Sequence, residues 1–103
     1  MKELLEKLKS LDPTTYKRYS QFSQHDNIYD KKILEYLLQG VLQEAISGKG
    51  WQGILLFDKE HSRAVIEEII DGWGGTRKLS EEIGNLPIEA LLKAYIAACE
   101  ANR

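Results

Sequence analysis

Residues 33–46 read ILEYLLQGVLQEAI, and in this stretch apolar residues recur as adjacent pairs every four residues. On a helix, that spacing gathers the apolar side chains into one broad stripe. Polar residues such as Glu35, Gln39 and Gln43 fall on the opposite side. The pattern therefore predicts a central helix around which a single core assembles.

Two residues set the expected ends of this helix, and one inside it needs an explanation. Asp30 can cap the start, and Gly48 suits the left-handed turn that commonly ends a helix. Gly40 lies in the interior, where glycine costs roughly 1 kcal/mol relative to alanine. We expect the backbone of another element to approach closely at Gly40 and to compensate for this cost.

Before the central helix, the sequence predicts two shorter helices joined at Asp12-Pro13. Asp12 can cap the second of them, while Pro13 takes the first helical position, where its missing N–H is not needed. Residues 20–27 are polar and without apolar period, so we expect a loop there. The first helix, over about residues 2–10, is indicated by leucines at helical spacing: Leu4, Leu5, Leu8 and Leu11.

The middle of the chain contains one predicted strand and one ambiguous segment. Residues 51–57, WQGILLF, read as a short buried strand bounded by glycine and aspartate. Residues 59–71 fit a helix by the spacing of their apolar residues, yet residues 63–70 are rich in β-branched residues. They could instead form the second strand of a hairpin. Each strand face would then mix glutamate with isoleucine, so periodicity favours the helix.

The end of the chain predicts a turn and a closing helix. Residues 72–78 read as a turn or a short exposed strand, and a helical apolar face follows Leu86-Pro87 as far as about Ala98. The whole chain, residues 1–103, is expected to form one α+β domain in which helices flank a short antiparallel strand or hairpin. The alternative is an all-α bundle of four or five helices.

Composition narrows the class of protein. The 103 residues are 43% apolar and 29% charged, which is ordinary for one globular domain. Fourteen basic residues against sixteen acidic ones give a net charge of −2, without the basic excess typical of nucleic-acid binders. The single cysteine, Cys99, suits a reducing cytoplasm. We expect no signal peptide in the charged residues 1–9, and no membrane span.

Catalytic and metal-binding patterns are not predicted. The potential ligands do not have the paired spacing of a zinc site: His25, Asp26, Asp30, Glu60 and His61. Cys99 falls on the apolar face of the closing helix, where a thiol is usually inert. Glu67-Glu68 and Glu81-Glu82 would diverge on a helix. We therefore expect no enzyme, no metal and no cofactor.

Two kinds of surface residue are candidates for binding a partner. Basic and aromatic residues alternate in Tyr16-Lys17-Arg18-Tyr19, as stacking plus phosphate contact would require, although an ordinary amphipathic helix explains them as well. Trp51 and Trp73 both lie beside glycines, and either could anchor a protein partner or be buried.

A glycine-rich turn offers a third candidate. Residues 74–78, GGTRK, place Arg77 and Lys78 before Ser80, which could open a helix that attracts an anion. A plain connecting turn with exposed charges is the favoured interpretation, because glycine-rich turns are common. Nucleic-acid binding remains the alternative to protein binding, through six basic residues: Lys17, Arg18, Lys31, Lys32, Arg77 and Lys78.

The chain from Leu38 onward resembles small uncharacterised bacteriophage proteins. The resemblance lies in residues 38–46 (LQGVLQEAI), Gly50-Trp51 and residues 86–95 (LPIEALLKAY). It implies a helix, short antiparallel strands and a C-terminal helix, which favours a hairpin over residues 51–70. It implies no catalytic or binding residue. We expect a non-enzymatic protein-interaction module, such as a phage accessory protein that binds a host protein, a viral protein or a second copy of itself in the cytoplasm.

Overall fold

The computed structural model describes residues 2–23, 31–70 and 74–102, and these form a mixed α+β fold, as predicted. The all-α alternative is wrong because three strands form one antiparallel sheet. In chain order the elements are α1 (Lys2–Leu11), α2 (Pro13–Ser23), α3 (Lys31–Gly48), β1 (Trp51–Phe57), β2 (Ser62–Ile70), β3 (Gly75–Gly84) and α4 (Pro87–Ala101).

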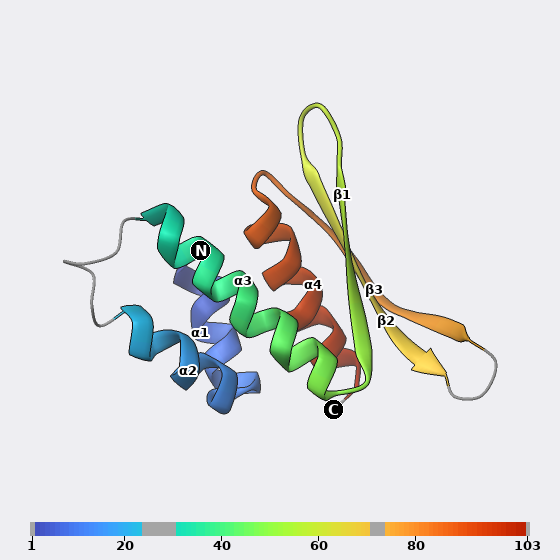
Figure 1. The fold of residues 1–103 in the computed structure, drawn as a ribbon, viewed down its shortest axis with the longest axis horizontal. Coiled ribbons are helices and arrows are strands. Elements are labelled where there is room, and N and C mark those ends of the chain that lie inside the picture. The colour runs from blue at the N-terminus through green and yellow to red at the C-terminus, as the bar shows by residue number, and fades with distance from the viewer. Residues whose placement is uncertain (1, 24–30, 71–73, 103) are drawn as a thin grey trace.

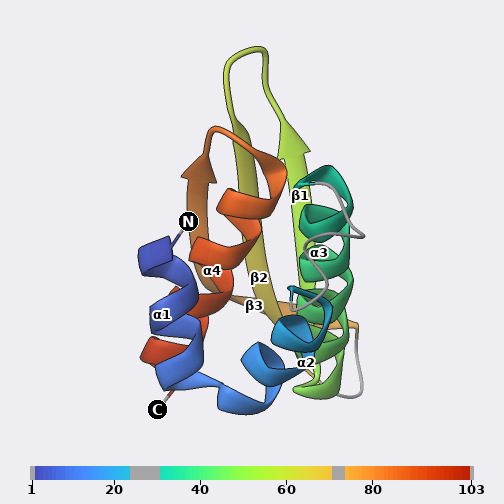
Figure 2. The ribbon, with the colours of Figure 1, turned by 90° about the vertical axis from the view of Figure 1, so that its left-hand side faces the viewer.

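The sheet is an antiparallel meander in the order β1-β2-β3, and the helices lie on one of its faces (Figure 1). α4 packs across β2 and β3, while α3 packs beside α4 and along β1 (Figure 2). α1 and α2 form an outer layer that contacts α4 and α3 but none of the strands. In the described part of the chain, nothing covers the other face of the sheet.

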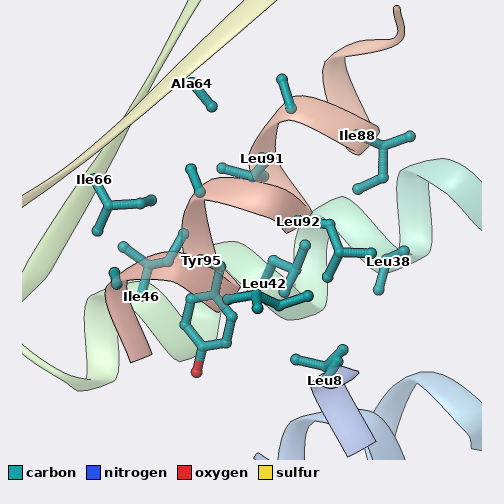
Figure 3. Close-up of a cluster of buried hydrophobic side chains, with 14 residues drawn as sticks. Leu8, Leu38, Leu42, Ile46, Ala64, Ile66, Ile88, Leu91, Leu92 and Tyr95 are labelled. Carbon is teal, nitrogen blue, oxygen red and sulfur yellow. The ribbon is translucent and has the colours of Figure 1, made fainter. Parts of the chain in front are cut away.

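The core lies between the sheet and the helices that cover it (Figure 3). Ile66 of β2 faces Leu91 and Tyr95 of α4, and Leu42 of α3 completes the layer. All four side chains are buried because the apolar stripe of each helix faces the sheet. Leu8 of α1 joins this cluster, so the outer helices share the same core.

The predicted junction at Asp12 is confirmed. The Asp12 carboxylate accepts the backbone N–H of Thr15 at 3.2 Å and the Thr15 hydroxyl at 2.6 Å, which caps the start of α2. The hydroxyl of Tyr95 in α4 donates to the same carboxylate. The corner between α1 and α2 is therefore attached to the core helix by a side-chain hydrogen bond.

The helix favoured over residues 59–71 is wrong, because the structure has strand β2 there. Strict alternation fails because Val65 is buried on the uncovered face among the apolar side chains of neighbouring strands, while Ala64 and Ile66 are buried against the helices. Glu67 and Glu68 follow this buried part and find polar partners on the neighbouring strands. The hairpin implied by the phage-protein resemblance is present.

β3 is longer than the predicted turn or short strand, and Ser80 does not open a helix. Ser80 lies within β3 and donates its hydroxyl to the Ala94 carbonyl of α4 at 2.6 Å. Ile66 pairs with Ser80 whereas Glu67 pairs with Lys78, so Leu79 is an extra residue that forms a bulge. Because no helix starts at Ser80, the anion site considered at that helix start is absent.

Three smaller expectations are also wrong. α2 continues to Ser23, so the predicted loop cannot begin at Ser20. The left-handed residue after α3 is Gly50, with φ of +75°, rather than Gly48. A methyl group at Gly40 would meet nothing within 4 Å outside its own helix, so no backbone approaches closely there.

Candidate functional site

The two free edges of the sheet differ in how they discourage pairing with another strand. β3 has the bulge at Leu79 and carries charged side chains along its length. Bulges and charges are the usual protection of an exposed edge. β1 reads WQGILLF, with seven residues and no charge, and its pairing with β2 is continuous. β1 is therefore the edge open to pairing.

Within the described part of the chain, the backbone groups of β1 that have no partner strand belong to alternate residues. Asp58 donates its N–H to the His61 carbonyl, and the Gly50 carbonyl accepts the N–H of Ile69, so these residues face β2. Along an antiparallel strand, the N–H and C=O groups of successive residues point alternately to one side of the strand and to the other. The N–H and C=O groups of the odd-numbered residues in β1 consequently point away from the sheet: Trp51, Gly53, Leu55 and Phe57.

A groove of about 530 Å³ runs along this edge, between β1 and α3. The volume lies within the roughly 300–1,000 Å³ typical of binding clefts. Gly53 opens the groove, because a methyl group there would lie 3.4 Å from Ile46 and 3.6 Å from both Ile66 and Leu91. The lining residues are Gln43, Ile46, Ser47, Trp51, Gln52, Gly53, Leu55, Ile69 and Leu91.

None of the residues lining the groove has a titratable side chain. Charged groups do lie beside it: the Lys49 ammonium stands 5.5 Å from the centre of the Trp51 ring, and the Glu67 carboxylate accepts a hydrogen bond from Gln52 at 2.8 Å. Trp51 packs edge-on against Tyr95, with 6.3 Å between ring centres.

Burial raises the pKa of the Cys99 thiol in α4, so this thiol stays protonated and unreactive near neutral pH.

The uncovered face of the sheet is apolar at one end and polar at the other. Ile54, Leu56 and Ile83 are partly exposed around Val65, which is 8% exposed. At the polar end, Glu67 accepts hydrogen bonds from Gln52 at 2.8 Å and from the Thr76 hydroxyl at 3.2 Å. The β1 groove differs from this face in combining a cavity with backbone groups that point away from the sheet.

The predicted binding residues are only partly brought together. Trp51 lines the groove, while Trp73 lies outside the described residues. Tyr16 and Tyr19 are partly buried and pack against the core, as the amphipathic-helix interpretation expects. Trp51 is therefore the one aromatic candidate with a described place at a groove.

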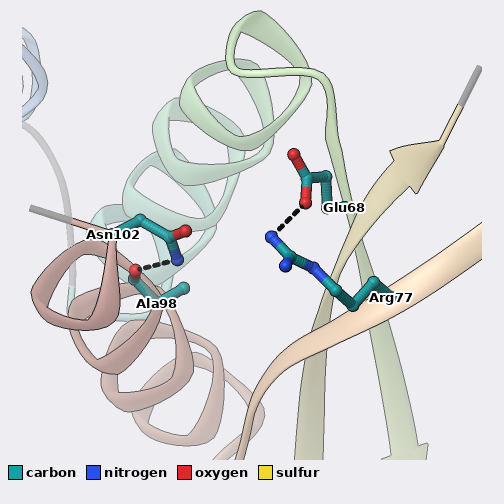
Figure 4. Close-up of polar contacts among 4 residues, drawn as sticks. All are labelled: Glu68, Arg77, Ala98 and Asn102. Carbon is teal, nitrogen blue, oxygen red and sulfur yellow. Dashed lines mark hydrogen bonds and ion pairs between the residues drawn. The ribbon is translucent and has the colours of Figure 1, made fainter.

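The basic candidates are dispersed over the described surface. Lys17 and Arg18 lie on α2, which contacts no strand, and Arg18 forms an ion pair with Glu44. Arg77 lies on β3 and pairs with Glu68 at 2.6 Å (Figure 4). Lys78, its neighbour in β3, pairs with Glu81 at 3.7 Å. The structure does not join these residues into one basic surface.

Lys32 is exposed at the start of α3, and the Lys31 side chain is not among those that the structure describes. The potential metal ligands Glu60 and His61 are exposed beyond β1. His25, Asp26 and Asp30 lie outside the described residues. Within residues 2–23, 31–70 and 74–102, no three His, Cys, Asp or Glu side chains gather as a metal site would require.

Gly53, Gln43 and Ser47 were not singled out from the sequence. A glycine inside an otherwise apolar strand often marks close approach by a ligand or another backbone, and Gly53 carried that signal. Gln43 and Ser47 had no comparable signal because they are ordinary polar residues on the outer side of a helix. Their importance comes from the position of α3 over β1.

Comparison with known proteins adds no functional information. No protein-family model, curated protein or solved structure matches the chain. Among the described helices, none has the length and apolar character needed to cross a lipid bilayer.

Proposed function

We propose that this chain is a non-enzymatic protein-interaction module that binds a segment of a partner in the groove between α3 and β1. The observation that carries the proposal is the coincidence of two features at one edge. The groove of about 530 Å³ lies against a strand that is uncharged and has unpaired backbone groups. Unprotected strand edges are rare in isolated proteins because they invite pairing.

The chemistry of the groove supports binding rather than catalysis. Its floor is formed by Ile46 and Leu91, and its polar groups are the neutral side chains Gln43, Ser47 and Gln52. An active site normally gathers titratable side chains that could act as acid, base or nucleophile. Binding clefts are instead mostly apolar, with a few polar groups that orient the ligand.

The setting we propose is the cytoplasm of a phage-infected cell, with a host or viral protein as the partner. The resemblance to phage proteins and the single Cys99 thiol support this setting.

Selection from a random peptide library, followed by NMR shift mapping, tests the function. Ser47→Arg places a bulky side chain at the groove, while Ser10→Arg makes the same change at an exposed position on α1. We expect selected peptides to shift the amide signals of Trp51 and Leu55. Their affinity should fall at least tenfold with Ser47→Arg and be unchanged with Ser10→Arg. Failure to enrich any peptide, or equal binding to both variants, would refute the proposal.

A further inference from the structure

We infer that the occupant of this groove is one extended segment of another protein, which joins the sheet as a fourth strand antiparallel to β1. The segment carries a large apolar side chain opposite Gly53. This inference rests on the proposed function and specifies both the shape and the chemistry of the partner. It assigns the groove to strand addition rather than to a helix or a small molecule.

The residues of β1 whose backbone groups point outward are also residues that line the groove. Trp51, Gly53 and Leu55 point their N–H and C=O groups outward, and the same three residues line the groove. A residue directly opposite Gly53 in an added strand would have its side chain on the same face as Gly53. That side chain would therefore enter the groove while its own backbone completes the hydrogen bonds of β1.

Gly53 has no conformational reason to be glycine. Positive φ angles occur at Gly50 and Gly74 among the described glycines, and Gly53 is not one of them. A methyl group at Gly53 would make ordinary contacts at 3.4–3.6 Å with the side chains below it. The glycine thus leaves open an apolar space, and a large side chain from a neighbouring strand is known to cover an edge glycine in this way.

The dimensions of the edge favour a single segment over a second copy of the chain. Seven residues of strand extend about 23 Å, a length that one extended segment can pair along completely. α3 lies over the outer edge of β1 (Figure 2), so a second copy paired through β1 would bring its own α3 onto the same strip. One extended segment fits beneath α3 without this conflict.

Charge sets the composition and direction of the segment. The lining is uncharged, so the residues that enter the groove must be uncharged as well. Lys49 stands beside Trp51, at the N-terminal end of β1, while Glu68, opposite Trp51 in β2, is paired with Arg77. In an antiparallel strand, that end meets the C-terminal end of the partner. An acidic residue or a carboxylate following the apolar residues would therefore face Lys49.

A series of seven-residue peptides tests the apolar position. The fourth residue is glycine, alanine, leucine or tryptophan. Valine occupies positions 2 and 6, and threonine occupies positions 1, 3, 5 and 7. An aspartate is added after position 7 as the C-terminal residue. Isothermal titration calorimetry on the full chain should show affinity rising at least tenfold from glycine to the largest side chain. Gly53→Ala should remove most of that rise. Gly75→Ala, a strand glycine whose added methyl meets nothing within 4 Å, should leave it unchanged.

Backbone methylation of the peptide tests the strand pairing. Methylated amides at residues 2, 4 and 6 would face β1 and should reduce affinity at least tenfold. Methylation at residues 3 and 5 would face solvent and should have little effect. Peptide binding should also slow hydrogen exchange at the Gly53 and Leu55 amides.

Each negative result of these binding experiments leads to a different conclusion. A library-selected peptide that Ser47→Arg blocks, but that tolerates both methylation patterns, would overturn strand addition and leave the proposed function standing. Binding of library peptides without binding of the designed series would have the same meaning. A wild-type dimer that Ser47→Arg dissociates would assign the groove to a second copy and overturn the inference. If no peptide of either kind binds, both proposals fail.

Discussion

Tyr95 of α4 donates its hydroxyl hydrogen to the carboxylate of Asp12, which lies 83 residues earlier at the corner between α1 and α2. The ring of Tyr95 also supports Trp51 at the groove. One buried side chain thus contacts the outer helical layer at its hydroxyl and the binding edge at its ring. Damage to this contact should affect the outer helices first, because the ring can remain in place without its hydroxyl.

Tyr95→Phe should lower the free energy of unfolding by about 1.5–3 kcal/mol, the usual contribution of a hydrogen bond to a charged group. Urea unfolding followed by circular dichroism measures the change. Tyr36→Phe is the matched control, because Tyr36 is 72% exposed and should lose less than about 0.5 kcal/mol. Equal effects of the two substitutions would show that the hydroxyl of Tyr95 contributes nothing through Asp12.

Stability should also fall in acid through Asp12. Burial by itself would raise the pKa of Asp12, but the hydrogen bonds from Thr15 and Tyr95 and the charge of Lys49 together bring it below its ordinary value of 3.8. A carboxyl whose pKa is lower in the folded state stabilises the fold above its unfolded pKa. This contribution is lost as the pH falls through the folded pKa. The stability difference between wild type and Asp12→Asn should therefore shrink from pH 7 to pH 3, and a constant difference would contradict the assignment.

Gly40→Ala should stabilise the protein by about 1 kcal/mol, because Gly40 lies inside α3 with open space around it. For a domain of this size, the midpoint of thermal unfolding should rise by about 4–8 °C. Differential scanning calorimetry provides the measurement. A fall in the midpoint would mean that another group occupies the space beside Gly40.

Gly84→Ala should have the opposite effect. A methyl group there would lie 2.7 Å from the backbone nitrogen of Ala90 and 3.1 Å from the Cβ of Glu89. Backbone cannot move aside as a flexible side chain can, so overpacking of about 1–3 kcal/mol is expected. The same calorimetric measurement checks it. An unchanged midpoint would show that β3 and the start of α4 are less closely packed than described.

Amide hydrogen exchange in the free protein should alternate along β1. The amides of Gln52, Ile54 and Leu56 face β2 and should exchange slowly, whereas those of Gly53 and Leu55 point away from the sheet and should exchange quickly. Residue-resolved NMR measures the rates. Uniform protection along β1 would mean that its outer edge is already paired.

The sequence is sufficient to predict the elements whose stability is local. The apolar stripe of α3, the Asp12-Pro13 start of α2 and the apolar run of β1 each carry their signal within a few residues, and all three are confirmed. β1 is, however, only partly buried rather than buried, because it lies at the edge of the sheet. Its position in the sheet depends on residues far along the chain.

The remaining elements could not be predicted because their partners define them. β2 lacks alternation because side chains of the neighbouring strands bury Val65 on the uncovered face. Its two glutamates likewise depend on Gln52, Thr76 and Arg77 from the strands on either side. β3 is polar along most of its length and forms because β2 offers it an edge. The groove exists only where α3 passes over β1, so local sequence gives a signal at Trp51 and Gly53 but not for the whole site.

The extra residue at Leu79 gives the two halves of β3 opposite parity. As a result, Lys78 shares a face with Glu81 while Arg77 points to the other side and meets Glu68. Both salt bridges of this strand thus depend on the bulge, which keeps Leu79 out of the pairing register. A regular register that included Leu79 would instead place Lys78 opposite Glu68 and turn it away from the face of Glu81, without altering any charge in the molecule.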